Sequence, residues 1–311
     1  MEIKEKYQII HSDVMDGLKQ LADKSVNCVI SSPPYWQLRD YGFAGQWGLE
    51  PTFQEYLDNL WSMMDEIYRV LTDDGTVWIN LGDTYGRGAR SKDGDNHDFV
   101  SNQSLVIEPT GKPNYFGLDK CLLMIPQRFA IGCIERGWIV RNEIIWAKPN
   151  GMPESVTDRF SKKHEQIYFM VKNKKYYFDL DAVREKHKQI SLDRINRKWD
   201  GHKEPGTSFA NMDITRMCNP NGKNPGDTWT ITTKGSSEKH YAMYNDNLIK
   251  RPILAGCPKG GVVLDMFMGT GTTGVTALHY DRKFIGIEAK KEYFDIANKN
   301  VETTILQQKL F

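Results

Sequence analysis

VVLDMFMGTGTTGVTAL, residues Val262–Leu278, joins a short apolar run, a glycine-containing turn and a segment with helical spacing. Gly269 and Gly271 allow the backbone to bend tightly and to approach a ligand closely. Thr272 and Thr273 suit the first turn of a helix whose N–H groups point at that ligand. The stretch therefore predicts a strand, a ligand-binding turn and a helix.

The residues around this turn indicate the kind of ligand. Glu288 ends the next apolar run, Lys283–Glu288, where an acidic side chain can accept hydrogen bonds from ribose hydroxyls. Asp265 precedes the turn, and the order Asp265, Phe267, Gly269, Gly271 differs from the dinucleotide pattern GxGxxG. A carboxylate at Asp265 suits an amino-acid ammonium better than a pyrophosphate. The pattern predicts an adenosine-type ligand, and a strand–turn–helix corner of purely structural purpose is the alternative.

A second informative stretch, SPPY, follows the apolar run Val26–Ser31. The diproline Pro33-Pro34 fixes φ and removes two N–H donors, which leaves backbone carbonyls that helices and sheets do not readily use. The Ser32 hydroxyl and the Pro33 carbonyl can accept from one NH2 group, and Tyr35 can stack on a flat ring. The segment predicts a site for a planar aminated base, with a plain proline turn as the alternative.

Apolar spacing along the chain predicts an α/β protein with a mostly parallel, doubly wound sheet, because strands alternate with helices. The expected helices are Phe53–Leu71 and Cys121–Arg136, in addition to the one after the glycine turn. The expected strands are Tyr7–His11, Val26–Ser31, Thr76–Leu81, Trp138–Lys148, Gln166–Lys172, Gly261–Phe267 and Lys283–Glu288. Arg87–Lys120 has no clear period and is interpreted as a long loop.

Composition excludes some classes of protein. The 311 residues carry 41 Lys and Arg against 40 Asp and Glu, so any nucleic-acid surface must come from local charge clusters. The five cysteines form no CxxC pair, which argues against a metal site and suits reduced intracellular thiols. The N-terminus lacks a signal-peptide pattern, and no apolar run reaches membrane-spanning length. We expect a cytoplasmic protein with no membrane partner.

Together the two motifs resemble those of the DNA amino-methyltransferases, the N4-cytosine and N6-adenine family. That family carries [DNS]-P-P-[YFW] and FxGxG, which correspond to SPPY at Ser32–Tyr35 and FMGTG at Phe267–Gly271. The order, SPPY first and FMGTG last, resembles the β-class. HSDVMDGL, RNEIIWAKPNGMPESVTDR and HEQIYFMVK also look like the family. The resemblance implies a Rossmann-like class I methyltransferase fold with a permuted motif order.

The resemblance also implies S-adenosylmethionine as the cofactor, without a metal. Asp13 would approach the adenine amino group and Glu288 the ribose, while Ser32, Pro33 and Tyr35 would hold the target base. The implied cofactor-binding residues are Asp13, Asp265, Phe267, Gly269, Gly271, Thr272, Thr273 and Glu288. The implied catalytic residues are Ser32, Pro33, Pro34 and Tyr35.

Two regions are candidates for contacts with DNA. Residues 181–240 are polar and basic where the family places a target-recognition region, so 1–180 and 241–311 would form the catalytic domain. The basic side chains expected at phosphates are Arg184, Lys186, Lys188, Arg194, Arg197 and Lys198, although such a run also fits a solvated helix face. Trp36, Arg39 and Tyr41 follow the SPPY segment and could close over a flipped base, or else pack in the interior.

The expected function is therefore site-specific methylation of cytosine N4 in double-stranded DNA, by direct attack of a flipped-out base on the methyl donor. SPPY is associated in the family mostly with cytosine, and adenine N6 is the first alternative. A non-catalytic nucleotide-binding module and an RNA or protein amine methyltransferase are the others. Carbon methylation would need a Pro-Cys pair, whereas Cys257 precedes Pro258 and is expected in the core. A homodimer and a cognate restriction enzyme are candidate partners, for which the sequence shows no signature.

Overall fold

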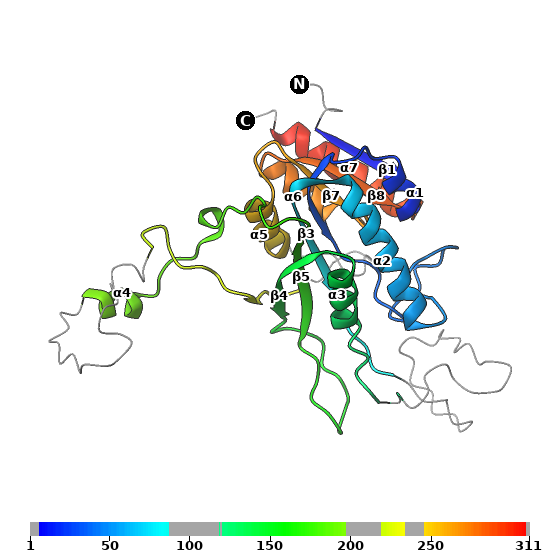
Figure 1. Cartoon of the computed structure of the whole chain (residues 1–311), viewed down its shortest axis with the longest axis horizontal. Helices are drawn as coiled ribbons and strands as arrows, with labels where there is room; N and C mark the ends of the chain where they lie inside the picture. Colours follow the sequence, from blue (N-terminus) through cyan, green and yellow to red (C-terminus); the bar gives the residue numbers. More distant parts are fainter. Residues whose placement is uncertain (1–5, 87–117, 119, 197–218, 234–245, 309–311) are drawn as a thin grey trace.

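The computed structural model describes residues 6–86, 118, 120–196, 219–233 and 246–308, and in this part of the chain the strands form one eight-stranded sheet (Figure 1). β5 runs antiparallel to both its neighbours, and the other neighbouring pairs are parallel. In spatial order the strands are β1 (Tyr7–His11), β8 (Lys283–Glu288), β7 (Val262–Asp265), β2 (Val26–Ser31), β3 (Leu71–Leu81), β5 (His164–Val171), β4 (Ile139–Ala147) and β6 (Thr228–Thr230). The predicted mostly parallel sheet is confirmed.

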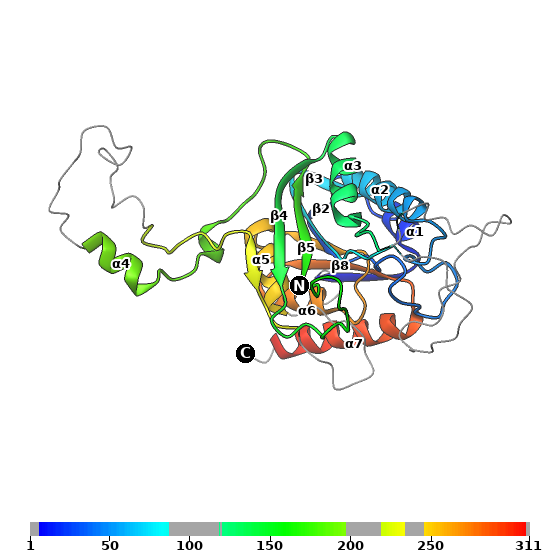
Figure 2. The same ribbon diagram turned by 90° about the horizontal axis from the view of Figure 1, so that it is seen from below.

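Helices cover both faces of this sheet (Figure 2). One face carries α1 (Val14–Lys19), α2 (Phe53–Val70) and α3 (Ile125–Glu135), and the other carries α5 (Asp246–Gly256), α6 (Thr272–His279) and α7 (Lys291–Gln308). α4 (Gln189–Asn196) lies apart from the sheet in both views. The doubly wound arrangement is confirmed, and it directs the carboxyl ends of the parallel strands to one edge.

The core divides into two clusters because successive residues of a strand point to opposite faces. On β3, Val77, Ile79 and Leu81 pack with the cluster beneath α1, α2 and α3. Trp78 belongs to the cluster beneath α5, α6 and α7, where it stacks on Phe169 with ring centroids 4.1 Å apart. Both faces of β3 are therefore buried from Thr76 to Leu81, which explains why this part of the strand is mostly apolar.

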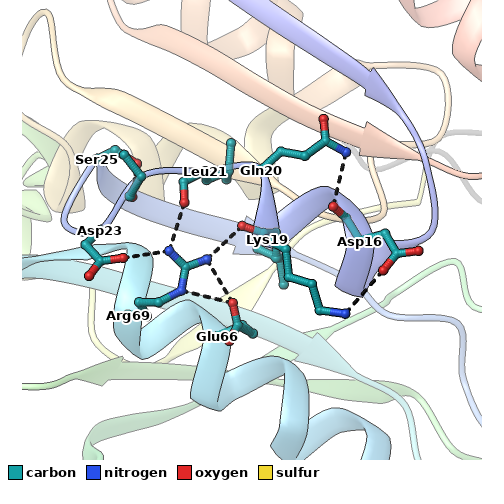
Figure 3. Close-up of polar contacts among 10 residues, drawn as sticks. Asp16, Lys19, Gln20, Leu21, Asp23, Ser25, Glu66 and Arg69 are labelled. Carbon is teal, nitrogen blue, oxygen red and sulfur yellow. Dashed lines mark hydrogen bonds and ion pairs between the residues drawn. The ribbon is translucent and has the colours of Figure 1, made fainter.

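The two ends of α2 are fixed by different contacts. At its start, the Thr52 hydroxyl accepts from the Glu55 backbone N–H and the Glu55 carboxylate accepts from that of Thr52, a reciprocal capping box. Near its end, Arg69 donates to the carbonyls of Leu18 and Leu21 and pairs with Asp23 and Glu66 (Figure 3). The guanidinium thus joins α2 to the connection between α1 and β2, the strand that leads into the diproline.

Several element bounds differ from the sequence predictions. β3 begins at Leu71 rather than Thr76, since Leu71 already pairs with Val26 of β2. α3 begins at Ile125 rather than Cys121, because Met124 adopts a left-handed conformation at the N-cap, φ 57°. α1, α5, α7 and the edge strand β6 were not predicted.

Two predictions concern segments that the structure describes only in part. The predicted loop Arg87–Lys120 lies outside the described residues apart from Leu118 and Lys120. β6 falls inside the predicted region 181–240 and pairs with β4, so residues 228–230 belong to the main sheet, while the division of the chain at 240 stays a prediction. Among the described residues, no helix combines the length and apolar character needed to cross a membrane.

Candidate active site

A pocket of about 590 Å³ opens at the carboxyl ends of the parallel strands. Ser32, Pro33, Pro34 and Tyr35, after β2, form part of its wall, which we call the diproline half. Phe267, Gly269 and Thr272, after β7, together with Glu288 at the end of β8 and Asp13 after β1, form the turn half. Because β2 and β7 are neighbours in the sheet, their last residues, Ser31 and Asp265, form a hydrogen bond across 234 residues of sequence, and the two motifs that follow them share one cavity.

The glycine turn holds Glu288 in the pocket. Gly269 and Gly271 have φ angles of 53° and 87°, a left-handed backbone that glycine adopts at low cost. The Gly269 N–H donates to Glu288 Oε2 at 3.0 Å, and the Lys290 N–H donates to Oε1 at 2.8 Å. Burial nevertheless raises the pKa of Glu288 to about 7, since desolvation outweighs these two hydrogen bonds.

Asp265 lies behind the pocket wall rather than on it. It is 1% exposed, and its carboxylate accepts from the Ser31 and Thr273 hydroxyls at 2.6 Å each and from the Phe267 N–H at 3.1 Å. Burial raises its pKa to about 6 against these three hydrogen bonds. In this geometry Asp265 and Thr273 order the turn and join it to β2, and the direct contact of Asp265 with a ligand ammonium stays a prediction.

The rest of the turn half fits an adenosine-type ligand. Phe267 meets Trp47 with ring centroids 5.5 Å apart, and Tyr293 also lines the cavity, so flat apolar surfaces are available to a purine. Asp13 sits at the predicted position after β1, where its carboxylate accepts from the Met15 N–H at 2.8 Å. Together with Glu288 it provides acceptors for an amino group and for hydroxyls.

In the diproline half, the orientation of Tyr35 is fixed on several sides. Its hydroxyl donates to Glu165 Oε2 at 2.7 Å and lies 3.2 Å from Asn80 Oδ1. Its ring lies against Gly82, where a Cβ atom would approach the ring to 2.4 Å. The Pro34 carbonyl accepts from the Tyr56 hydroxyl at 2.8 Å. The corner is therefore rigid, as the diproline predicts.

Sequence reasoning missed two polar residues beside Tyr35, Asn80 and Glu165, and it gave no role to a third, Lys148, in the family-like stretch Arg141–Arg159. Asn80, Lys148 and Glu165 all line the pocket, and Lys148 forms an ion pair with Glu165 in which both side chains are at least four-fifths buried. Asn80 had a signal, since it is the polar residue within the buried run TVWINL. Glu165 had none, because its place at the pocket follows from its pairing with Trp146 across β4 and β5.

The three aromatic and basic residues after SPPY lie in different places. Trp36 is 4% exposed, its indole N–H donates to the Glu50 carbonyl at 2.9 Å, and its ring meets the edge of Phe53. Trp36 is thus a packing residue in this structure, which is the second of the two roles expected for it. Arg39 and Tyr41 line the pocket, where burial raises the pKa of the Tyr41 hydroxyl.

The basic segment after Asp181 is described only in part. Arg184 pairs with Asp181 and donates to the Gly222 carbonyl, so it stabilises the segment itself, and its contact with phosphates stays a prediction. Lys186 and Lys188 are exposed, as a phosphate contact requires. Arg194 lies on α4, its side chain is not described, and Arg197 and Lys198 lie outside the described residues.

The described residues offer neither a metal centre nor a cysteine nucleophile at Cys257. Within the described ranges, no group of three or more His, Cys, Asp or Glu side chains is placed to hold a metal ion. Cys257 is fully buried in the core, as expected, and burial raises its thiol pKa to about 12, which suppresses the thiolate that a nucleophile requires.

Comparison with known proteins gives consistent results. The profile of the N6/N4 DNA methylase family, described as DNA methylase, matches residues 26–299. The type II methyltransferase M.Cfr9I of Citrobacter freundii is 37% identical over 93% of this chain and 85% of its own length, and M.SmaI of Serratia marcescens is 35% identical over 94% and 90%.

Solved structures share the fold at low sequence identity. PvuII DNA methyltransferase (cytosine-N4-specific) matches with a TM-score of 0.64 at 16% identity, over 96% of this chain and 90% of that one. The M1.HpyAVI–SAM complex matches with a TM-score of 0.54 at 19% identity, over 95% and 98%. These two likenesses confirm the predicted methyltransferase-type α/β fold.

Proposed function

We propose, from the premise that this chain belongs to the N6/N4 DNA methylase family, that it is a type II DNA methyltransferase acting on N4 of cytosine in duplex DNA. The observation that carries the proposal is the single pocket shared by the diproline half and the turn half. A methyl donor in one half and a flat aminated base in the other would meet without rearrangement of the sheet.

S-adenosylmethionine, when bound, supplies a methyl group on a sulfonium, which needs no covalent enzyme intermediate. Glu288 would accept from the ribose hydroxyls, and Asp13 from the adenine amino group. Gly269 and Thr272 would lie along the methionine part, beside the wall formed by Phe267. Asp265 acts indirectly, by holding the turn through Phe267 and Thr273.

The diproline half would activate the target amine. The nitrogen lone pair of this amino group is delocalised into the ring of the base, which makes the amine a weak nucleophile. Hydrogen bonds from the amino group to Ser32 Oγ and the Pro33 carbonyl would localise the lone pair and stabilise the positive charge that grows on nitrogen. Tyr35 would stack on the ring, and its fixed orientation keeps the amine in line with the methyl group. The base must leave the duplex to reach this pocket.

Ser32 supports cytosine over adenine as the target, because SPPY accompanies cytosine in most of the family that the motif resembles. The test is transfer of labelled methyl groups to duplex DNA, followed by digestion to nucleosides and mass spectrometry. We expect N4-methyldeoxycytidine. N6-methyldeoxyadenosine would overturn the choice of base, and label in RNA or protein alone would overturn the proposal.

Residues 181–227 are proposed to read the DNA sequence, with Lys186 and Lys188 at phosphates, and residues 1–180 with 228–311 to form the catalytic domain. Exchange of 181–227 for the matching segment of a relative should move the methylated site, as read by sequencing the methylated genome of an expressing cell. An unchanged site would contradict this division. A cognate restriction enzyme and a homodimer remain proposals. The first is tested by whether DNA methylated by this protein resists cleavage by a restriction enzyme, and the second by sedimentation.

A further inference from the structure

A line of polar groups leads from the diproline corner into the protein. Ser32 Oγ lies 3.5 Å from the Tyr35 hydroxyl, which donates to Glu165 Oε2 at 2.7 Å. The Asn80 amide lies 3.3 Å from the same carboxylate oxygen, and Lys148 pairs with the other oxygen. The line therefore ends on a carboxylate whose two oxygens face different partners.

Stability alone does not account for this group of charges. Lys148 and Glu165 are 17% and 15% exposed, and a buried ion pair is often no more stable than apolar side chains of the same size. The Lys148 ammonium also lies 4.1 Å from the centre of the Trp146 ring, and Trp146 is the register partner of Glu165. The sheet thus fixes the carboxylate beside the pocket, where its charge can act on a ligand.

Methylation of an amine releases a proton that needs an acceptor. The nitrogen–methyl bond forms, the sulfonium–methyl bond breaks to leave a neutral thioether, and the nitrogen loses one hydrogen as a proton. We propose that Glu165 receives this proton through the Tyr35 and Ser32 hydroxyls. Each hydroxyl accepts one proton and passes on its own, so the carboxylate becomes neutral as the sulfonium charge disappears. The inference rests on the proposed function, amine methylation.

The geometry suits such a transfer. The 3.5 Å between Ser32 Oγ and Tyr35 Oη is long for two hydroxyls, and catalytic hydrogen bonds commonly shorten when the substrate binds. Before the proton moves, the negative charge of Glu165 also stabilises the positive charge growing on the amine. Lys148 is a positioning residue, because its ion pair with Glu165 Oε1 directs Glu165 Oε2 toward the Tyr35 hydroxyl.

The test compares Glu165→Gln and Tyr35→Phe with the wild type in single-turnover methyl transfer, at saturating S-adenosylmethionine and duplex DNA. Each change breaks the line but keeps the size of the side chain. We expect each to slow transfer by about 100-fold, the lower range of acid–base catalysis, with affinities for cofactor and DNA within threefold of wild type. The double variant should be no slower than either single one, because both act on the same path.

The double variant Lys148→Met with Glu165→Gln distinguishes a catalytic role of the Glu165 charge from a purely structural role of its ion pair with Lys148. This pair of changes removes both charges together and leaves no buried ion without a partner. We expect transfer to stay as slow as in Glu165→Gln. A return to the wild-type rate would overturn the inference, as would a Glu165→Gln rate within threefold of wild type.

A matched control is the hydrogen-bonded pair Tyr168 on β5 and Glu143 on β4. The Tyr168 hydroxyl donates to Glu143 Oε1 at 3.1 Å, and neither residue lines the pocket. Tyr168→Phe and Glu143→Gln should leave the transfer rate near that of wild type, and equal losses there would show a general effect of the sheet and overturn the inference. If the wild-type protein methylates adenine, only the choice of base is refuted. If it methylates no amine, both the proposed function and the proton path to Glu165 are refuted.

Discussion

Single side chains fix the shape of the turn half, and Asp265 does so from behind the pocket wall through three hydrogen bonds. Its carboxylate accepts from Ser31, Thr273 and the Phe267 N–H, so Asp265→Ala leaves three donors without their acceptor. We expect S-adenosylmethionine to bind at least tenfold more weakly, about 1.4 kcal/mol, in calorimetry. Asp295→Ala, on the exposed side of α7, is the control. Unchanged affinity in Asp265→Ala would mean that the turn does not depend on it.

Glu288 gives cofactor binding a pH dependence. Its pKa is raised to about 7, so the free protein holds a proton there below that pH, while ribose hydroxyls need the ionised carboxylate as acceptor. Affinity should therefore rise with pH by about tenfold between pH 6 and 8 and level off above, because binding below pH 7 must first displace the proton. Glu288→Gln should flatten the profile in titration calorimetry. A flat wild-type profile would place the ribose elsewhere.

The same raised pKa affects folding in the opposite direction. Between the ordinary carboxyl value of 4.5 and about 7, the folded chain holds a proton on Glu288 that the unfolded chain releases. The contribution of Glu288 to the free energy of unfolding therefore falls as pH rises through this window. This conflict between stability and ligand contact is typical of a binding site.

Gly82 tests the diproline half without touching a hydrogen bond. Gly82→Ala would place a Cβ atom 2.4 Å from the Tyr35 ring, so the ring must shift. A displacement of about 1 Å in a positioned group costs on the order of 100-fold in rate, and we expect that loss in turnover, with cofactor affinity unchanged in calorimetry. Wild-type turnover would mean that the position of Tyr35 is unimportant.

At the scale of elements, Arg69 is the contact that joins α2 to the α1–β2 connection (Figure 3). Arg69→Ala leaves two backbone carbonyls without this donor, and we expect a loss of about 2 kcal/mol in the free energy of unfolding, measured in urea. Lys19→Ala is the control, since its ion pair with Asp16 is exposed and should contribute little. Equal stability of Arg69→Ala and wild type would contradict the role of this link.

Elements with a strong apolar period were predictable, and those held by distant partners were not. β1, β2 and β8 have the predicted bounds because each is a compact apolar run. β6 has three residues and one buried side chain, Trp229, so only its pairing with β4 makes it a strand. In α7 polar residues outnumber apolar ones, and its packing on α6 and β1 fixes it as a helix.

At the scale of the whole molecule, the site arises because the sheet places β7 beside β2. The sequence motifs predicted both halves of the pocket, since SPPY and the glycine turn each follow an apolar strand. Glu165 could not be predicted in the same way, because its position depends on the antiparallel register of β4 and β5. Trp36 shows the converse, a residue next to the motif in sequence whose side chain turns into the core.

A bisubstrate compound tests most directly whether the two halves serve one reaction. In it a methylene group joins cytosine N4 to a nitrogen that replaces the sulfur of S-adenosylmethionine. Calorimetry should show tighter binding than that of S-adenosylmethionine alone, weakened by Glu288→Ala and by Tyr35→Ala, while Tyr35→Ala leaves cofactor affinity unchanged. Binding no tighter than the cofactor, with no effect of Tyr35→Ala, would show that base and methyl donor do not meet in this pocket.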